Sequence, residues 1–248
     1  MITANESTDV SISLFFPVYN DERTVRQVAE KSIAVLSKLT ATYEVIIIND
    51  GSPDKSGEIA DSLAKEHECV RVVHHEKNLG YGAALKTGFA TAKYKWICFT
   101  DGDDEYDVFD LMKLIKLIEY YALIITFRYE RMYSTRRIFI SRVYNKVFSF
   151  LFKTNFRDIS TGLRLARKDM LDELALISNS PFIGAELTLK AMLKGYPVGE
   201  VGIQTFPREF GKGQSTTIKN IVATIKDMMA VRKQVFSPTY ELPHNRKR

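Results

Sequence analysis

The chain has few cysteines, a single tryptophan and no long apolar run. Its 248 residues include only two cysteines, Cys69 and Cys98. Their spacing is not that of metal ligands, so we expect buried thiols in a reducing compartment and no disulfide framework. No stretch approaches the ~20 apolar residues of a membrane span. Residues 1–9 also lack the apolar core of a signal peptide, so we expect a chain that is not integral to the membrane.

The composition is that of a globular protein with a sizeable core. Hydrophobic residues make up 45% of the chain and charged residues 26%, which does not fit a disordered chain. The net charge is +5 and the sequence pI is about 9.0, which favours anionic partners. Nucleic acid, a phosphorylated substrate and an anionic membrane surface all meet this condition, and charge alone does not choose among them.

Strand and helix patterns alternate through the first hundred residues. Strand patterns separated by helical spacing predict a mostly parallel sheet with helices on both faces, a Rossmann-like α/β half that binds nucleotides. The predicted strands are residues 10–16, ended by Pro17, then 43–48, 70–74 and 94–99. The predicted helices are residues 21–39, 56–67 and 82–91, and helical spacing returns at 218–236.

Carboxylates follow the last of these strands, in Asp101-Gly102-Asp103-Asp104-Glu105. Such a cluster repels itself unless a cation is bound, and Mg²⁺ often shares one or two carboxylates with substrate phosphates. The alternative is a solvated loop or a negatively charged helix N-terminus. Residues 17–21 and 49–52 also follow strands, so we expect all three segments to meet in one crevice. Taken singly, 49–53 also fits a tight turn with an N-cap.

Two common nucleotide-binding motifs are missing. No Gly-x-Gly-x-x-Gly follows the first strand, and no Gly-Lys-Ser/Thr loop of the Walker type is found. A glycine-bearing turn at 74–82 instead precedes a helix whose free N–H groups could face an anion.

The ordered motifs at 17–22, 49–54, 78–84 and 101–103 resemble family 2 of the inverting glycosyltransferases, which has the GT-A fold. Downstream, residues 158–164, 182–186 and 207–211 are similar to the branch that contains dolichol-phosphate mannose synthases and bacterial polyprenyl-phosphate glycosyltransferases. The resemblance covers roughly residues 10–236. It implies a single catalytic domain over 1–236, with a nucleotide-sugar half at about 10–105 and an acceptor half at about 106–236. Residues 237–248 are expected to form a basic, disordered tail.

The resemblance also implies roles for individual residues. Glu105 stands where that branch commonly has Gln, and Asn49 replaces an acidic residue, which leaves the base of the nucleotide open. Glu186 lies where the wider family often has an acidic residue near the acceptor, but it also fits a helix N-terminal charge. The implied donor-binding residues are Pro17, Tyr19, Asp21, Ile48, Asp50, Asp101, Gly102 and Asp103; the ligands of a divalent cation (Mg²⁺ or Mn²⁺) are Asp101, Asp103 and Glu105; the catalytic residues are Asp103 and Arg208; and the acceptor phosphate is held by Arg128, Arg137 and Ser141.

Residues 136–153 have the pattern of a basic amphipathic helix. Apolar residues alternate with Arg136, Arg137, Arg142, Lys146 and Lys153. Such a helix can lie in a membrane interface with its cations near anionic headgroups. The alternative is an ordinary helix that packs its apolar stripe into the core.

Three functions are consistent with these patterns. The leading expectation is a metal-dependent inverting glycosyltransferase that moves a sugar from GDP-mannose or a UDP-sugar to a polyprenyl or dolichyl phosphate. It would act as a peripheral protein at the cytoplasmic membrane face, either alone or with a membrane partner protein. The second has the same donor chemistry with a saccharide or protein hydroxyl acceptor. The third is a non-catalytic module that binds nucleotides or nucleic acid. Nucleic acid is not expected as a partner, because base-stacking aromatics are not interleaved with the basic residues.

Overall fold

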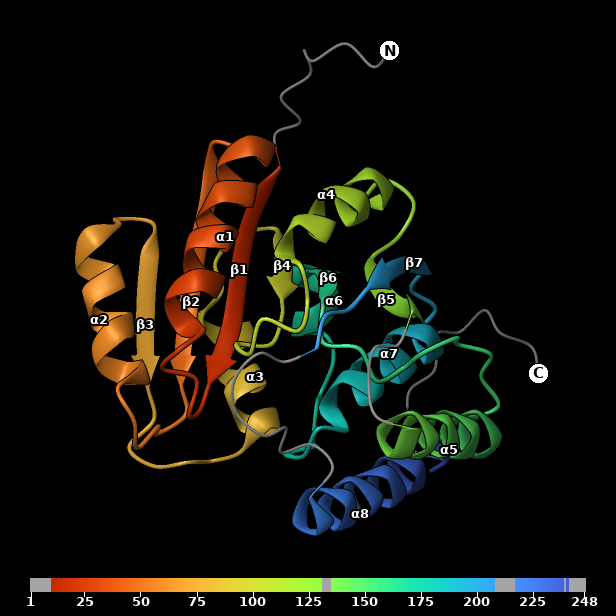
Figure 1. Ribbon diagram of the computed structural model, residues 1–248. Helices are drawn as coiled ribbons and strands as arrows, with labels where there is room; N and C mark the ends of the chain where they lie inside the picture. Colours follow the sequence, from red (N-terminus) through yellow and green to blue (C-terminus); the bar gives the residue numbers. More distant parts are fainter. Residues whose placement is uncertain (1–9, 131–134, 208–216, 239, 241–248) are drawn as a thin grey trace.

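The computed structural model contains one seven-stranded sheet with helices on both sides (Figure 1). It describes residues 10–130, 135–207, 217–238 and 240. The first part of the chain forms β1 (Ser11–Val18), α1 (Val25–Leu39), β2 (Thr42–Asn49), α2 (Ser56–Glu66), β3 (Val70–His74), α3 (Tyr81–Thr91) and β4 (Trp96–Phe99). The second part forms the 3-10 turn η1 (Val108–Asp110), α4 (Leu111–Leu114), η2 (Ile115–Leu117), β5 (Leu123–Glu130), α5 (Thr135–Phe152), β6 (Arg164–Arg167), α6 (Lys168–Asp172), α7 (Ile183–Leu193), β7 (Val198–Gln204) and α8 (Ile218–Val235).

The sheet has the strand order β3-β2-β1-β4-β6-β5-β7. Strands β3, β2, β1 and β4 are parallel, as are β5 and β7, whereas β6 is antiparallel to both of its neighbours. The predicted α/β class with a mostly parallel sheet is therefore confirmed. The insertion of β6 between β4 and β5 joins the two parts of the chain in one sheet.

The end of β1 differs from the prediction. We expected Pro17 to end this strand, but β1 continues to Val18, and Pro17 is opposite Ile48 of β2. On its other side β1 pairs with β4 only as far as Phe15. Pro17 therefore lies beyond the end of β4, where a residue without an N–H group breaks no ladder hydrogen bond.

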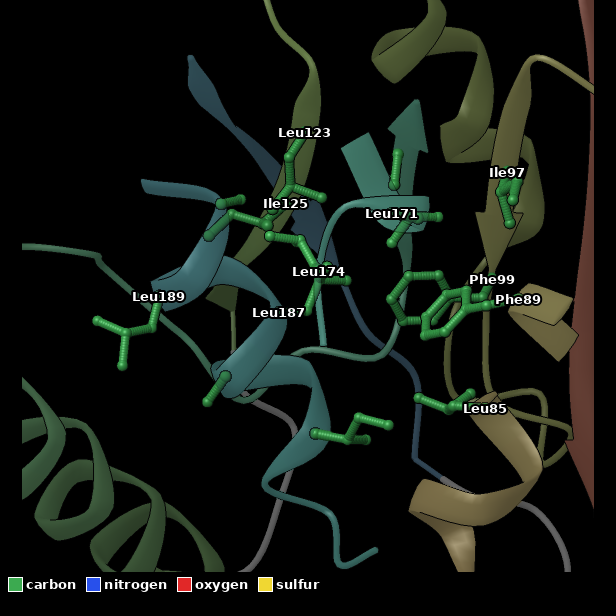
Figure 2. Packing of buried hydrophobic residues seen from close by; sticks show 14 of the residues in the cluster. Leu85, Phe89, Ile97, Phe99, Leu123, Ile125, Leu171, Leu174, Leu187 and Leu189 are labelled. Atoms are coloured by element: carbon green, nitrogen blue, oxygen red, sulfur yellow. The ribbon is translucent and has the colours of Figure 1, made fainter. Parts of the chain in front are cut away.

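Both faces of the sheet are buried. Side chains of successive strand residues point to opposite faces, and Phe15 accordingly packs in one core cluster while Leu14 and Phe16 pack in the other. Figure 2 shows the cluster that contains Phe89 and Phe99 together with leucines of α3 and α7. The ring centroids of Phe89 and Phe99 are 5.2 Å apart in an edge-on arrangement. This packing fixes the carboxyl ends of the strands on which the site is built.

Helices α5 and α8 pack against the same cluster from one side. Phe148 and Phe152 of α5 and Val231 of α8 belong to it. Figure 1 shows both helices at the end of the molecule toward which β1 and β3 point. No helix in the described part of the chain combines the length and the apolar character of a bilayer-spanning segment.

Residues 237, 238 and 240 of the predicted tail are described by the structure. Tyr240 is partly buried and packs against the same cluster as α5 and α8. Burial raises the pKa of its phenol. Residues 239 and 241–248 of the predicted tail lie outside the described residues.

Candidate active site

The loops that follow β1, β2 and β4 contact one another, as the sequence predicts. The backbone N–H of Asn20, which has a positive φ of 61°, donates to Oγ of Ser52 over 2.8 Å. The hydroxyl of Thr24 donates to the carbonyl of Gly102 over 2.7 Å. A side chain at Gly102 would collide with the carbonyl oxygen of Pro17, so only glycine allows the two loops to approach this closely.

Asp101 is held from two sides. The hydroxyl of Tyr81, at the start of α3, donates to Oδ1 of Asp101 over 2.7 Å. On the other side the Asp101 carboxylate lies against Gly162, where a Cβ atom would collide with it and crowd the ring of Tyr106. Burial, and then the negative charge of Asp101, raise the pKa of Tyr81 well above its usual value. Tyr81 therefore stays a hydrogen-bond donor to this carboxylate at physiological pH.

Asp103 and Asp104 are neighbours in sequence but face different surroundings. Asp103 is 8% exposed, and its Oδ1 accepts the backbone N–H of Glu105 over 3.1 Å. Asp104 has a positive φ of 59°, and its carboxylate is bound by Lys31 of α1 at 2.8 Å and by Gln27. The left-handed turn at Asp104 thus directs one carboxylate toward α1 while Asp103 stays at the end of β4.

The three predicted metal ligands do not form a three-carboxylate site. In the described residues, no three His, Cys, Asp or Glu side chains lie together as they would around a metal ion. Tyr81 and Gly162 fix Asp101, and the Glu105 side chain is buried, 2% exposed. The oxygen ligands present nevertheless suit Mg²⁺ or Mn²⁺, because such ions commonly take one or two carboxylates and complete their coordination with phosphate oxygens and water.

Both carboxylate oxygens of Asp50 accept hydrogen bonds from the loop that leads into α3. Its Oδ1 accepts the backbone N–H of Leu79 at 2.9 Å and contacts Nδ1 of His75 at 2.7 Å, and its Oδ2 accepts the N–H of Gly80 at 2.9 Å. The Nε2 atom of His75 in turn lies 2.9 Å from the Thr87 hydroxyl. The structure therefore gives Asp50 a role that the sequence did not suggest, since it fixes the loop that leads into α3. Its predicted contact with the base stays a prediction.

The other predicted donor residues lie at the ends of β1 and β2 and in the loop after β1. The side chain of Ile48 is fully buried in the core, so only its backbone reaches the edge of the sheet. Pro17 lies in β1, and the backbone N–H of Tyr19 donates to Oδ2 of Asp21 over 2.9 Å. Asp21 therefore shapes the loop after β1, and its predicted contact with the ribose or base is untested.

The predicted acceptor residue Arg128 lies in a buried polar cluster. It is 9% exposed, its Nε donates to Oδ2 of Asp158 at 2.8 Å, and its Nη2 donates to Oδ1 of Asp158 at 3.1 Å. The same Nη2 reaches Oγ of Ser160 at 2.6 Å and Oγ of Ser141 at 3.4 Å. The structure thus brings Arg128 and Ser141 together as predicted, with a carboxylate on one edge of the guanidinium that the prediction did not include.

Asn145 of α5 connects this cluster to the helix. Its Nδ2 donates to the carbonyl of Ser141 at 2.9 Å and lies 3.3 Å from Oδ1 of Asp158, and its Oδ1 accepts the backbone N–H of Ile159 at 2.9 Å.

The side chains of two predicted site residues are not described by the structure. Arg137 lies on α5, and its side chain is not among those described; Arg208 lies outside the described residues.

Glu186 is a structural residue. Its side chain is fully buried, its Oε1 is 2.5 Å from the Lys190 ammonium, and its two oxygens each accept a backbone N–H at 2.8 Å, from Ile177 and Ser178. A carboxylate with these partners fixes the segment before α7. Glu186 lies in the first turn of α7, as the helix-charge interpretation expects. Its hydrogen-bond and ion-pair partners belong to the preceding loop and to α7 itself.

Sequence reasoning missed four residues that shape the site: Tyr81, Asn145, Asp158 and Ser160. The motif at 158–164 was noticed as a resemblance, without a role for any of its residues. A pattern of residue types could not reveal these roles, because each of the four residues has a partner in a distant segment of the chain, such as Asp101 for Tyr81 and Arg128 for Asp158.

Comparisons with known proteins agree with this geometry. Residues 13–175 match the family described as Glycosyl transferase family 2. Glycosyltransferase AglD of Haloferax volcanii is 25% identical over 96% of this chain, which spans only 38% of that protein. Polyprenol monophosphomannose synthase of Mycolicibacterium smegmatis is 28% identical over 80% of this chain and 78% of that protein.

A solved structure has the same fold. Glucosyl-3-phosphoglycerate synthase of Mycobacterium tuberculosis, crystallised with Mn²⁺, UDP and phosphoglyceric acid, superimposes with a TM-score of 0.72. It is 17% identical and covers 91% of this chain and 78% of its own. The expected GT-A fold and family resemblance are confirmed, and the chain belongs to glycosyl transferase family 2.

Proposed function

We propose that the chain transfers a sugar from a nucleoside diphosphate to a polyprenyl phosphate, with its donor half at 10–105 and its acceptor half at 106–236. One observation carries this proposal. The loop at 158–162 contacts the donor-side carboxylate of Asp101 through Gly162 and the acceptor-side cation of Arg128 through Asp158 and Ser160. A carboxylate site suited to a metal diphosphate thus adjoins a cationic site suited to a second phosphate. The similarity to polyprenol monophosphomannose synthase of Mycolicibacterium smegmatis supports the lipid-phosphate acceptor.

The donor side is assigned to Asp101 and Asp103. Asp103 lies at the end of β4 with one oxygen bound by a backbone N–H, and Tyr81 orients Asp101. When bound with the donor, Mg²⁺ or Mn²⁺ supplies Lewis-acid stabilisation of the negative charge on the leaving diphosphate. The structural relative with Mn²⁺ and UDP supports this assignment.

The acceptor side favours a phosphate over a hydroxyl. A phosphate oxygen is already anionic at neutral pH, because its second ionisation lies near pH ~6, so it can attack without a general base. The phosphate oxygen forms a bond to the anomeric carbon from one face, and the bond to the diphosphate oxygen breaks on the other. A hydroxyl acceptor needs a base. The carboxylate considered for that role, Glu186, is instead bound to Lys190 and two backbone amides.

The outer faces of α5 and α8 fit a peripheral position on an anionic membrane, which we assign to the cytoplasmic side. The sequence of α5 contains no acidic residue, and the single acid of α8, Asp227, accepts the backbone N–H groups of Asn179 and Ser180. Exposed lysines of α8 recur every seven residues, at Lys219, Lys226 and Lys233, and Arg232 is exposed as well. Apolar side chains beside them are exposed: Phe139, Val143, Val147 and Phe150 on α5, and Ile218, Val222, Ile225 and Met229 on α8. Such surfaces bind interfaces through apolar burial and headgroup attraction.

The test is an incubation of the purified protein with Mg²⁺ or Mn²⁺, polyprenyl phosphate and radiolabelled GDP- and UDP-sugars one at a time. Label from one donor in the organic phase, lost on addition of EDTA, is the expected result. Metal-dependent release of free sugar without lipid label would instead indicate a saccharide or protein hydroxyl acceptor. No turnover with any donor or metal would leave only the non-catalytic nucleotide-binding alternative.

A further inference from the structure

Arg164 is a fully buried arginine between the donor and acceptor sides. It is 1% exposed, and among the described residues it is the largest fully buried side chain. Its Nε donates to the carbonyl of Thr161 at 3.1 Å and its Nη2 to the carbonyl of Ile159 at 2.7 Å. Both carbonyls belong to the 158–162 loop, so one guanidinium binds the loop on each side of Ser160. Burying a cation is unfavourable unless its hydrogen bonds are satisfied, and this loop supplies two of them.

The other edge of the guanidinium binds α7. Nη1 donates to the carbonyl of Gly184 and, over 2.7 Å, to the hydroxyl of Thr188. A Cβ atom at Gly184 would lie 3.0 Å from Nη2 of Arg164, so the absence of a side chain there makes room for the guanidinium. Arg164 therefore joins the 158–162 loop to α7.

The loop that Arg164 holds has two functional sides. On one, Asp158 and Ser160 bind Arg128. On the other, Gly162 lies against the carboxylate of Asp101. Burial lowers the pKa of Arg164, and the neighbouring Tyr81, Tyr144, Tyr106 and Asp158 oppose that shift. An arginine remains charged in such surroundings, so its positive field also reaches the Tyr81–Asp101 pair.

We infer that Arg164 is a positioning residue that aligns the acceptor-side cluster with the donor-side carboxylate by fixing the 158–162 loop. The inference rests on the proposed function and deepens it, because it names the residue that places the donor and the acceptor relative to each other. A loss of alignment reduces transfer more than it reduces donor hydrolysis, since only transfer needs both substrates in register. The ratio of transfer to donor hydrolysis therefore separates alignment from general damage to the fold.

The decisive variant is Arg164→Lys. A lysine keeps the charge, but a single ammonium cannot reach the carbonyls of Ile159, Thr161 and Gly184 together. We expect a fall of about 10- to 100-fold in the ratio of lipid transfer to donor hydrolysis. Hydrogen–deuterium exchange in peptides covering the loop should rise as well. The matched control is Arg26→Lys, the same substitution at an exposed arginine that binds Glu66 through two nitrogens, and it should keep the wild-type ratio.

A second variant covers the case in which Arg164→Lys does not fold. Gly184→Ala keeps Arg164 and favours helix, but it pushes the guanidinium by a few tenths of an ångström toward the loop. We expect a ratio reduced about threefold or more, with faster loop exchange. Wild-type ratio and wild-type loop exchange in Gly184→Ala, or in a folded Arg164→Lys, would overturn the inference.

Failure of the proposed function looks different. If the wild-type protein hydrolyses donor without labelling polyprenyl phosphate, the acceptor assignment is wrong. The exchange measurement then decides on Arg164 alone. Faster exchange at 158–162 in Arg164→Lys but not in Arg26→Lys supports its hold on the loop, and equal exchange in all three proteins contradicts it.

Discussion

The phenolic hydroxyl of Tyr81 donates a 2.7 Å hydrogen bond to Oδ1 of Asp101, joining the start of α3 to the end of β4. Hydrogen bonds to charged groups are worth about 1.5–3 kcal/mol. We therefore expect Tyr81→Phe to lower kcat/KM for the donor about tenfold or more, measured at saturating acceptor. Tyr196→Phe is the control, because it removes the same kind of bond, to Glu173 at 2.6 Å, on an exposed surface. Equal effects of the two substitutions would contradict the role of Tyr81.

Asp103→Asn should abolish metal-dependent transfer and leave the melting temperature nearly unchanged. The substitution removes a charge at the end of β4 without removing core packing. The adjacent Asp104→Asn is the control, because Asp104 faces Lys31 and Gln27 of α1 and should retain activity. The two variants are compared in the donor-turnover assay across a series of Mn²⁺ concentrations. Wild-type turnover of Asp103→Asn would exclude Asp103 from the donor site.

Asp50→Asn should destabilise the protein more than a surface substitution does. An amide nitrogen cannot accept a hydrogen bond, so at least one of the partly buried N–H groups of Leu79 and Gly80 loses its acceptor. The expected loss in the free energy of unfolding is about 1–3 kcal/mol, measured by urea denaturation. Asp61→Asn, at an exposed pair with His74, is the control and should change stability little. An unchanged midpoint for Asp50→Asn would mean that the loop before α3 does not depend on this carboxylate.

A double variant distinguishes the stabilising role of the Arg128–Asp158 ion pair from a role of Arg128 in binding the acceptor phosphate. Arg128→Gln leaves a buried carboxylate without its ion-pair partner, which costs about 3–5 kcal/mol of stability. Adding Asp158→Asn removes that charge and should restore much of the stability, measured by thermal denaturation. Lipid transfer should stay low in the double variant, because the cation for the acceptor phosphate is still missing. Recovery of both stability and transfer would assign Arg128 a structural role only.

Phe150→Glu should weaken membrane binding without loss of stability. Phe150 is 84% exposed on α5, beside the cations of that helix. Co-sedimentation with vesicles containing phosphatidylserine measures the effect, and a fall of about tenfold in the partition coefficient is expected from the loss of apolar burial and the added negative charge. Tyr120→Glu provides the control, since Tyr120 is also exposed, at 68%, in the turn before β5. Equal binding of both variants and the wild type would remove α5 from the membrane-binding surface.

The sequence by itself determined the arrangement of the first hundred residues. Apolar strands and amphipathic helices alternate there, and local periodicity is enough to predict a parallel sheet whose polar carboxyl ends converge. It also predicted that Arg128 and Ser141 belong together, through the resemblance of their segments to a known branch. The strands of the second half were not predicted, because β6 is short and antiparallel, and its pairing with β4 and β5 depends on contacts distant in sequence.

Only the tertiary structure decided which of the similar side chains serve which purpose. Asp103 and Asp104 are adjacent carboxylates, and a left-handed backbone turn sends the second toward α1. Asp50 and Glu186 are acidic residues in motif positions, yet backbone amides from other loops bind them. Arg164 has no distinguishing local pattern, and its role follows from carbonyls on the 158–162 loop and α7 that surround it after folding. Local sequence fixes periodicity and residue type, whereas the burial of a charged group and the identity of its partners arise from long-range packing.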